Sequence, residues 1–339
     1  MPFRDDTEAP QSPRAIDPLA RFGELFAAFD AGRGFWGDRA PLRLAAASLV
    51  TTPGDATELA TRVRARDVEL KPHYGGWTSS VADSVRLVLA ATLVRTGESA
   101  DDFAAATARV QALMRTAKVK RSGMHEIIAA MILRRVVQGE PELHHVERMR
   151  GIYDCMKHHH WFLTGPEDLA ASAMLIGRAG TPDQIGDHVE AIYRRLADAP
   201  KIWGGDELQT AANVLGLVAL APEEAATRFL AIASALRERG IKVRGGEYDE
   251  VAVLAFLPRS AAMVAERVAA MRERIVAELA WHEDAMGTSL AADLAFVEML
   301  QAEPDARVGA LADAKMLLDM QSIVAMRQAA AIGAAAAST

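Results

Sequence analysis

The sequence lacks several features that would mark particular classes of protein. It holds a single cysteine, Cys155, among 339 residues, so no internal disulfide forms and we expect a reducing, cytoplasmic location. It holds no run of about 18 apolar residues, so we expect no transmembrane helix and no membrane partner. The polar N-terminus lacks the apolar core of a secretory signal. The net charge of −7 argues against a nucleic-acid partner, which requires a basic surface.

Strand signals and catalytic motifs are also missing. Alternation of β-branched residues is hard to find, whereas apolar residues recur at helical spacing, as at Val81, Val85 and Leu89. The high content of Ala, Leu, Glu, Arg and Met agrees with helices. There is no GxSxG, no glycine–lysine phosphate loop, no CxxC, no HxxxH and no HExxH. We therefore expect an all-α protein without a familiar catalytic signature.

Glycines recur along the chain at a nearly constant interval. Successive spacings are 47, 42, 40, 41 and 41 residues, and the anchors are Gly76, Gly123, Gly165, Gly205, Gly246 and Gly287. Each anchor precedes a helical pattern, a loop with glycine or proline, and a second helical pattern. An alanine stands six positions after the first five anchors, at Ala82, Ala129, Ala171, Ala211 and Ala252. A small side chain at that position lets neighbouring helices approach closely.

Two helices in roughly 40 residues are typical of helical-hairpin repeats. We predict about six or seven hairpins, stacked as an α-solenoid or an α/α superhelix; one compact helical bundle is the alternative. A degenerate unit covers residues 41–70, a helix near 17–30 precedes it, and an apolar helix near 307–328 ends the array. The expected organisation is a disordered leader at 1–15, one repeat domain at 16–328 and an Ala-rich tail at 329–339.

The joint around Gly165 carries the densest group of polar residues. Thr164, or Gly165 itself, fits the cap of a following helix, Pro166 fits its first turn, and Asp168 lies where the helix dipole favours negative charge. The run 158–160 consists of three histidines. Neighbours on a helix point about 100° apart, so the three cannot ligate one metal together. We expect no metal and no cofactor, and interpret the run as a solvated helix end.

Equivalent joints of a repeat protein align, so polar and aromatic residues beside the anchors would share one edge and could hold a ligand. The candidate catalytic residues are His125, His160, Asp168 and Glu207. The candidate ligand-binding residues are Tyr74, Trp77, Phe162, Thr164, Trp203 and Tyr248. Capping is the alternative explanation for the acids, and packing between repeats is the alternative for the aromatic residues.

Residues 152–168 match the pattern IYxxMKxxHxFLTGxxD. This pattern resembles that of a bacterial family, domain-of-unknown-function family four-thousand-and-three, and the similarity extends over about 40–330. The resemblance implies an uncharacterised all-helical protein. It also singles out His160, Phe162, Thr164 and Asp168 as one unit, whether as a cap or as a site.

Two functions from different classes fit these observations. The leading prediction is a helical-repeat binding or scaffold protein that presents a groove or an edge to a protein, a peptide or a small molecule. The alternative is an enzyme, with or without a metal, whose site lies where helix N-termini converge around His160 and Asp168. A homodimer that buries the apolar face of the helix near 307–328 is a third, structural prediction.

Overall fold

A computed structural model describes residues 16–32, 39–75, 81, 83–218, 220–279 and 284–301. Within these ranges the chain forms fourteen α-helices and one 3-10 turn, and no strand. The expectation of an all-α fold is therefore confirmed. The predicted leader at 1–15, the helix near 307–328 with its predicted dimer face, and the tail at 329–339 lie outside the described residues.

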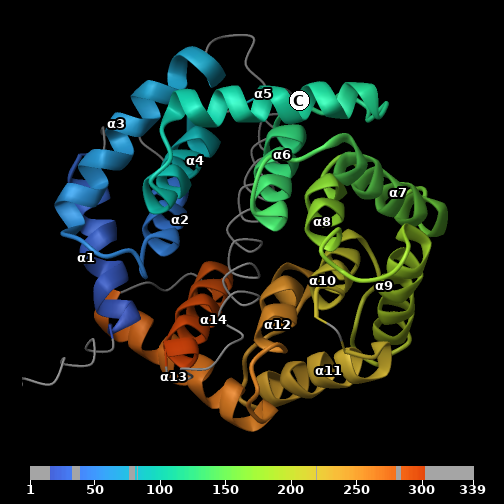
Figure 1. The fold of residues 1–339 in the computed structure, drawn as a ribbon. Helices are drawn as coiled ribbons and strands as arrows, with labels where there is room; N and C mark the ends of the chain where they lie inside the picture. Colours follow the sequence, from blue (N-terminus) through green and yellow to red (C-terminus); the bar gives the residue numbers. More distant parts are fainter. Residues whose placement is uncertain are drawn as a thin grey trace, which may run out of the picture.

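The helices alternate between an outer and an inner layer of a ring (Figure 1). The outer layer consists of α1 (Pro18–Ala31), α3 (Ala56–Tyr74), α5 (Ala100–Thr116), α7 (Leu143–His159), α9 (Pro182–Ala197), α11 (Pro222–Glu238) and α13 (Ala261–Leu279). The inner layer consists of α2 (Ala40–Ser48), α4 (Asp83–Thr96), α6 (Met124–Val137), α8 (Asp168–Leu175), α10 (Asp206–Leu215), α12 (Tyr248–Leu254) and α14 (Asp284–Gln301). The predicted helical-hairpin repeat is confirmed, with seven outer–inner pairs in the described ranges.

The first and last hairpins meet, so the superhelix closes on itself. Helix α1 packs against both α13 and α14. The guanidinium of Arg274 on α13 lies 2.8 Å from the carboxylate of Asp17, which also caps α1. The backbone N–H of Ile16 donates to the side-chain oxygen of Gln301 at the end of α14, at 2.9 Å. An open repeat array needs polar capping units at its ends; here the two end hairpins cover each other instead.

Burial differs between the two layers. Every residue of α8 is buried, whereas outer helix α9 buries one face, which includes Ile185, Val189, Ile192 and Leu196. Four of the repeated alanines are buried on inner helices: Ala129, Ala171, Ala211 and Ala252. The fifth, Ala82, lies outside the described residues. Small side chains therefore occupy the inner layer where helices pack on both sides.

The anchor glycines mark most of the joints, with one exception. Gly123 and Gly205 are the N-caps of α6 and α10, with φ of 59° and 148°, which favour glycine. Gly246 lies in the 3-10 turn Gly245–Glu247, directly before α12. Gly287 lies inside α14 rather than ahead of it, so the sixth predicted joint is wrong: the interval recurs, but the helix starts earlier. Gly76 lies outside the described residues.

Arginine side chains tie successive repeats together. The last carbonyl groups of a helix have no partner inside the helix. Arg148 on α7 donates to the carbonyls of Ile176 and Arg178 after α8 and of Gly180 in the following turn. Arg178 in turn donates to the carbonyls of Gly216 and Val218 after α10. Each guanidinium thus donates hydrogen bonds to backbone carbonyls that follow an inner helix of a neighbouring repeat.

One crossing between outer helices is close enough to predict the effect of a single methyl group. A Cβ on Gly186 of α9 would lie 2.8 Å from the Cβ of Cys155 on α7, and closer still to its Sγ. We expect Gly186→Ala to lower the free energy of unfolding by about 2 kcal/mol, because overpacking outweighs the gain in helix propensity. Urea denaturation measures this. Gly139→Ala is the control, since a Cβ there meets nothing within 4 Å; equal stability of the two variants would contradict the close crossing.

Candidate functional site

The joints of consecutive repeats lie side by side at one rim of the ring. The side-chain amide of Gln209 on α10 donates to the hydroxyl of Thr164, ahead of α8, at 3.0 Å. The backbone N–H of Trp203, ahead of α10, donates to the hydroxyl of Tyr248 at the start of α12, at 3.0 Å. The predicted alignment of these joints is therefore present for α8, α10 and α12.

Asp168 is a buried carboxyl at this rim. Its Oδ2 accepts the backbone N–H of Gly165 at 3.0 Å, and its Oδ1 accepts from the amide of Asn213 on α10 at 3.2 Å. Burial above all, together with the nearby carboxylates of Glu167 and Asp206, raises the pKa of Asp168 from 3.8 to about 7. Asp168 thus fastens the turn before α8 to the neighbouring inner helix.

The predicted cap of α8 is wrong in its details. The helix begins at Asp168, so Thr164 lies too early to be its N-cap residue. The hydroxyl of Thr164 accepts from Gln209 and belongs to the contact between repeats. The carboxylate of Asp168 binds the turn instead, by accepting the N–H of Gly165.

His160 ends α7 and contacts α9. Its Nε2 lies 2.5 Å from the Oε2 of Glu190, whose other oxygen lies 2.5 Å from the Nε of Arg194. The imidazole also meets the ring of Tyr193 edge to face, with centroids 4.4 Å apart. Since His160 faces α9 whereas Asp168 faces α10, their side chains take part in separate packing contacts.

The two remaining catalytic candidates stand on other inner helices. His125 lies half-buried in the first turn of α6, and Glu207 lies exposed in the first turn of α10. Gly245, ahead of α12, packs beside Glu207, where an added Cβ would lie 3.4 Å from its carboxyl carbon. The described contacts therefore distribute the four candidates around the rim, on different elements, rather than into one hydrogen-bonded constellation.

Two of the candidate aromatic residues belong to the core. Tyr248 is fully buried, and its ring packs edge to face against Phe229 at 5.9 Å. Tyr74 is half-buried against Phe103, and burial raises the pKa of its hydroxyl. Packing between repeats, the alternative explanation, therefore describes both residues. Trp77 lies outside the described residues.

The other candidate aromatic residues are open to solvent. Phe162 is 67% exposed and Trp203 is 78% exposed. Trp161, which the sequence analysis did not select, is 76% exposed, and its ring lies 5.9 Å from that of Phe162. Large exposed aromatic side chains at two successive joints are available for contact with a ligand or a partner.

A cavity of about 350 Å³ opens at the same rim, between the loop that joins α5 to α6, the last turns of α7 and the start of α8. Its cationic lining residues are Lys118, Lys120, Arg121, Arg150 and Lys157. Its one acidic lining residue, Asp154, pairs with Arg150 at 3.2 Å. Within the described part of the chain, no ion pair involves the other four cations. We call this cavity the basic cleft.

Local structure holds these cations in place. After α5 ends at Thr116, Lys118 adopts a left-handed φ of 58° and turns the chain back. Arg150 donates to the carbonyl of Ala117 at 2.6 Å, which fixes this turn against α7. The ammonium of Lys157 lies 5.9 Å from the ring centroid of Tyr153, one turn earlier on α7. The walls therefore come from two consecutive repeats.

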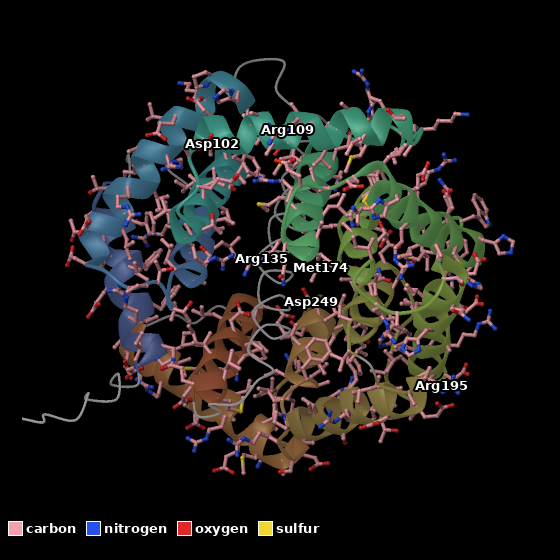
Figure 2. All side chains as sticks on the ribbon, in the orientation of Figure 1. Asp102, Arg109, Arg135, Met174, Arg195 and Asp249 are labelled. Atoms are coloured by element: carbon pink, nitrogen blue, oxygen red, sulfur yellow. The ribbon has the colours of Figure 1, made fainter. Side chains whose placement is uncertain are left out.

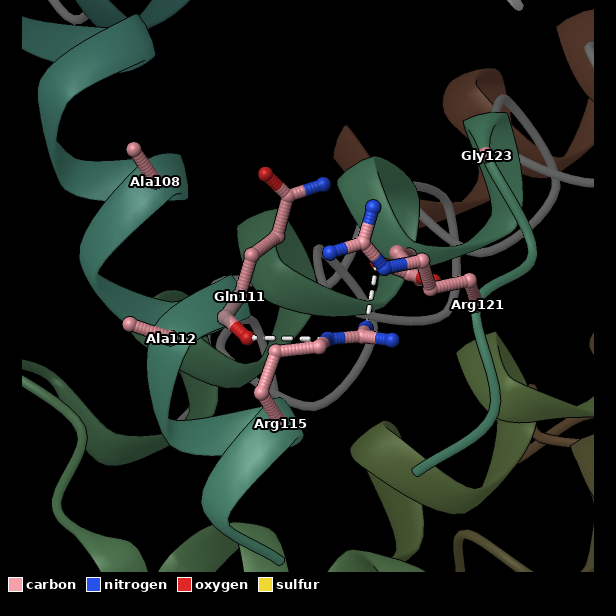
Figure 3. A pocket seen from close by; sticks show the side chains of 7 residues that line it. Ala108, Gln111, Ala112, Arg115, Arg121 and Gly123 are labelled. Carbon is pink, nitrogen blue, oxygen red and sulfur yellow. Dashed lines mark hydrogen bonds and ion pairs between the residues drawn. The ribbon is translucent and has the colours of Figure 1, made fainter. Parts of the chain in front are cut away.

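A second hollow, of about 440 Å³, adjoins the basic cleft through Arg121, which lines both (Figure 3). Across this hollow, Arg115 lies 2.6 Å from Glu126 and donates to the carbonyl of Gln111 at 3.3 Å. Figure 3 shows the side chain of Arg121 extending toward Arg115. Because Glu126 neutralises Arg115, the uncompensated charge between the two hollows is that of Arg121.

The basic cleft was not predicted from the sequence, although part of its signal is visible there. Residues 118–121 read Lys-Val-Lys-Arg directly before the anchor Gly123. Such a run in an acidic protein is a local concentration of positive charge. Arg150 and Lys157 come from the next repeat, so only the fold brings them to that loop.

Cys155, the single cysteine of the sequence, lies on α7. It is half-buried between α7 and α9. Burial raises the pKa of its thiol, and the carboxylate of Asp187 raises it further. As a free thiol it is therefore a poor nucleophile.

Comparison with known proteins places the chain in a family. The family described as "Protein of unknown function (DUF4003)" matches residues 45–329, which include the whole basic cleft. No curated protein and no solved structure matches the chain. Among the described helices, none has the length and apolar character that crossing a membrane requires.

Proposed function

Because the chain belongs to the DUF4003 family, whose description assigns no role, we propose a function from its own geometry: it binds a small anionic ligand in the basic cleft. This proposal refines the leading prediction of a helical-repeat binding protein. It rests on one observation, the four cations of the cleft that lack an acidic partner within the described residues.

The charge balance of the cleft supports this proposal. The whole chain has a net charge of −7, yet the cleft gathers five cations and one acid. Like charges held together repel, so a bound anion would relieve this repulsion and gain charge-assisted hydrogen bonds. Clefts lined by one sign of charge also concentrate ligands of the opposite sign.

The size and lining of the cleft support a small molecule that carries phosphate or carboxylate groups. Its volume of about 350 Å³ lies at the lower end of the range for small-molecule sites. Apolar walls from Val119, Pro166 and Leu169 and the ring of Tyr153 accompany the cations. Such a mixed lining favours a ligand with an anionic group and a short apolar body.

A peptide or protein partner is the second candidate, favoured by the exposed aromatic residues. Trp161 and Phe162 at one joint and Trp203 at the next expose large rings. Aromatic residues are enriched where protein interfaces form. An acidic peptide would combine both features, with its carboxylates in the basic cleft.

The enzyme alternative draws on Asp168. A carboxyl with a pKa of about 7 is suited to proton transfer near neutral pH. However, Asp168 is only 6% exposed, and both of its oxygens accept hydrogen bonds from the protein. These contacts support a structural role for Asp168.

Charge reversal at Lys120 tests the proposed function. Inorganic pyrophosphate and citrate serve as probes in isothermal titration calorimetry. We expect the protein to bind at least one of them more weakly as salt rises, and Lys120→Glu to weaken that binding about tenfold or more. Lys242→Glu is the matched control, because it changes the net charge equally at an exposed residue outside the cleft.

Two results would contradict the proposal. One is an equal loss of affinity in both variants, which would reflect net charge rather than the cleft. The other is no binding of either probe together with no small anion released when natively purified protein is denatured and analysed by mass spectrometry.

A further inference from the structure

A second cluster with ligand chemistry lies on the opposite face of α7 from the basic cleft. Cys155 and His159 are four residues apart on this helix and therefore share a face. Asp187 comes from α9, which packs against that face. The thiol sulfur, an imidazole nitrogen and a carboxylate oxygen of these three residues all lie within 4.8 Å of one another.

The packing of the two helices brings these donors together. Gly186 lets α9 approach α7 closely at Cys155, whose Sγ lies 3.8 Å from the carbonyl oxygen of Asp183. The Nε2 of His159 lies 2.8 Å from the Oδ1 of Asp187. The side chain of His159 is 20% exposed and that of Asp187 is 65% exposed, so the cluster opens to solvent on one side.

We propose that Cys155, His159 and Asp187 bind one divalent ion of the zinc class. Thiolate and imidazole are ligands that zinc and its neighbours prefer, whereas calcium and magnesium require oxygen ligands. One thiolate and one carboxylate balance the charge of a divalent cation. Three protein ligands leave a fourth tetrahedral position for water or another small ligand.

The observed geometry requires ligand atoms to shift by about 1 Å to hold such an ion. Bonds of about 2.0–2.3 Å in a tetrahedral arrangement place ligand atoms roughly 3.5 Å apart. The His159–Asp187 pair at 2.8 Å therefore opens by less than about 1 Å when an ion replaces the shared proton. The exposed side chain of Asp187 can make this change by rotation.

This site differs from the one that the sequence analysis considered. Adjacent histidines point apart on a helix, so the run 158–160 alone predicts no shared metal site, and the sequence contains no HxxxH. The structure recruits only His159 from the run 158–160 and pairs it with Cys155, four residues earlier. His158 is exposed and is not one of the three clustered ligands, so it offers a matched control.

Cobalt titration tests the proposal directly. Untagged full-length protein, kept reduced and stripped with a chelator, is titrated with Co²⁺ alone and then with Zn²⁺ alone. We expect one ion per chain and a near-ultraviolet charge-transfer band from sulfur to cobalt. Cys155→Ser should abolish this band, and His159→Gln and Asp187→Asn should each weaken binding at least about tenfold. His158→Gln should behave like the wild-type protein.

Every other outcome overturns the proposal. These outcomes are no bound ion, a band or an affinity that survives in the three ligand variants, or a loss of binding in His158→Gln. Thermal unfolding of the metal-free variants checks that they are folded, and Cys155→Ser is nearly isosteric with the natural residue. Pyrophosphate or citrate binding should not change in the ligand variants, so this proposal and that of the basic cleft fail independently.

Discussion

Relative to the wild-type protein, an Asp168→Asn variant is expected to gain about 4 kcal/mol of stability as the pH rises from 4 to 8, because it lacks the carboxyl whose ionisation opposes folding. The folded-state pKa of Asp168 is about 7, against 3.8 for an unperturbed aspartate. Between these values the unfolded chain has released the proton and the folded chain still holds it. Stability therefore falls as pH rises, by about 1.4 kcal/mol per pH unit, and levels off above the folded pKa.

Asparagine mimics the protonated carboxyl that the buried site favours. Its oxygen can accept the N–H of Gly165, as Asp168 does. The Oδ1 of Asn213 has no hydrogen-bond partner among the described residues, so this amide can turn to accept from the new NH₂ group. The variant thus avoids ionisation without losing its hydrogen bonds.

Urea denaturation at several pH values measures the difference between wild type and variant. We expect this difference to grow by about 1.4 kcal/mol per unit between pH 5 and 7, in favour of Asp168→Asn. Asp198→Asn, at an exposed position after α9, is the control for loss of a carboxylate. Parallel pH profiles for wild type and Asp168→Asn would show that the carboxyl titrates normally in the folded protein.

Replacing Arg148 with methionine is expected to lower the free energy of unfolding by about 3 kcal/mol. Its Nε and Nη1 donate to the carbonyls of Ile176 and Gly180 at 2.9 and 2.8 Å, and its Nη2 donates to that of Arg178. Methionine retains most of the apolar stem but none of the donors. Each partly buried carbonyl that loses its donor costs about 1 kcal/mol or more.

The planar fork of the guanidinium is the feature under test. Arg148→Lys keeps the charge but presents a single ammonium, so we expect it to recover less than half of the loss. Arg267→Met, at an exposed position on α13, controls for the loss of a cation. Denaturant unfolding gives the stabilities, and amide hydrogen exchange over residues 176–180 should rise first in the Arg148 variants. Full recovery in Arg148→Lys would assign the effect to charge instead.

Much of the fold was predictable because each repeat carries the same sequence pattern within about 40 residues. Helical spacing, anchor glycines and the buried alanines all describe one repeat unit at a time, so a unit such as α8 followed by α9 after Gly165 is predictable from a short window of sequence. Closure of the ring is not predictable in this way. It depends on contacts such as that between Asp17 and Arg274, which are 257 residues apart, so no short stretch of sequence indicates it. Gly287 shows the limit of spacing alone, since the interval continues while the helix boundary moves.

The candidate site was less predictable, because residues at equivalent positions of the repeat pack in different tertiary environments. Phe162 and Tyr248 both stand beside an anchor glycine, yet one is 67% exposed and the other is fully buried. His160 looked available until Glu190, thirty residues later, proved to be its partner. The cations of the basic cleft come from two repeats, and only those at 118–121 are adjacent in the sequence.

The closed arrangement of the hairpins in Figure 2 changes how such a repeat protein comes apart. An open array unravels from either end, because an end unit is held by one neighbour only. Here α1 and α14 pack against each other, so each of the seven described hairpins has two neighbours. Detaching any one of these hairpins must break its contacts with both neighbours at once. Neither α1 nor α14 is therefore a site where unfolding starts at a low free-energy cost.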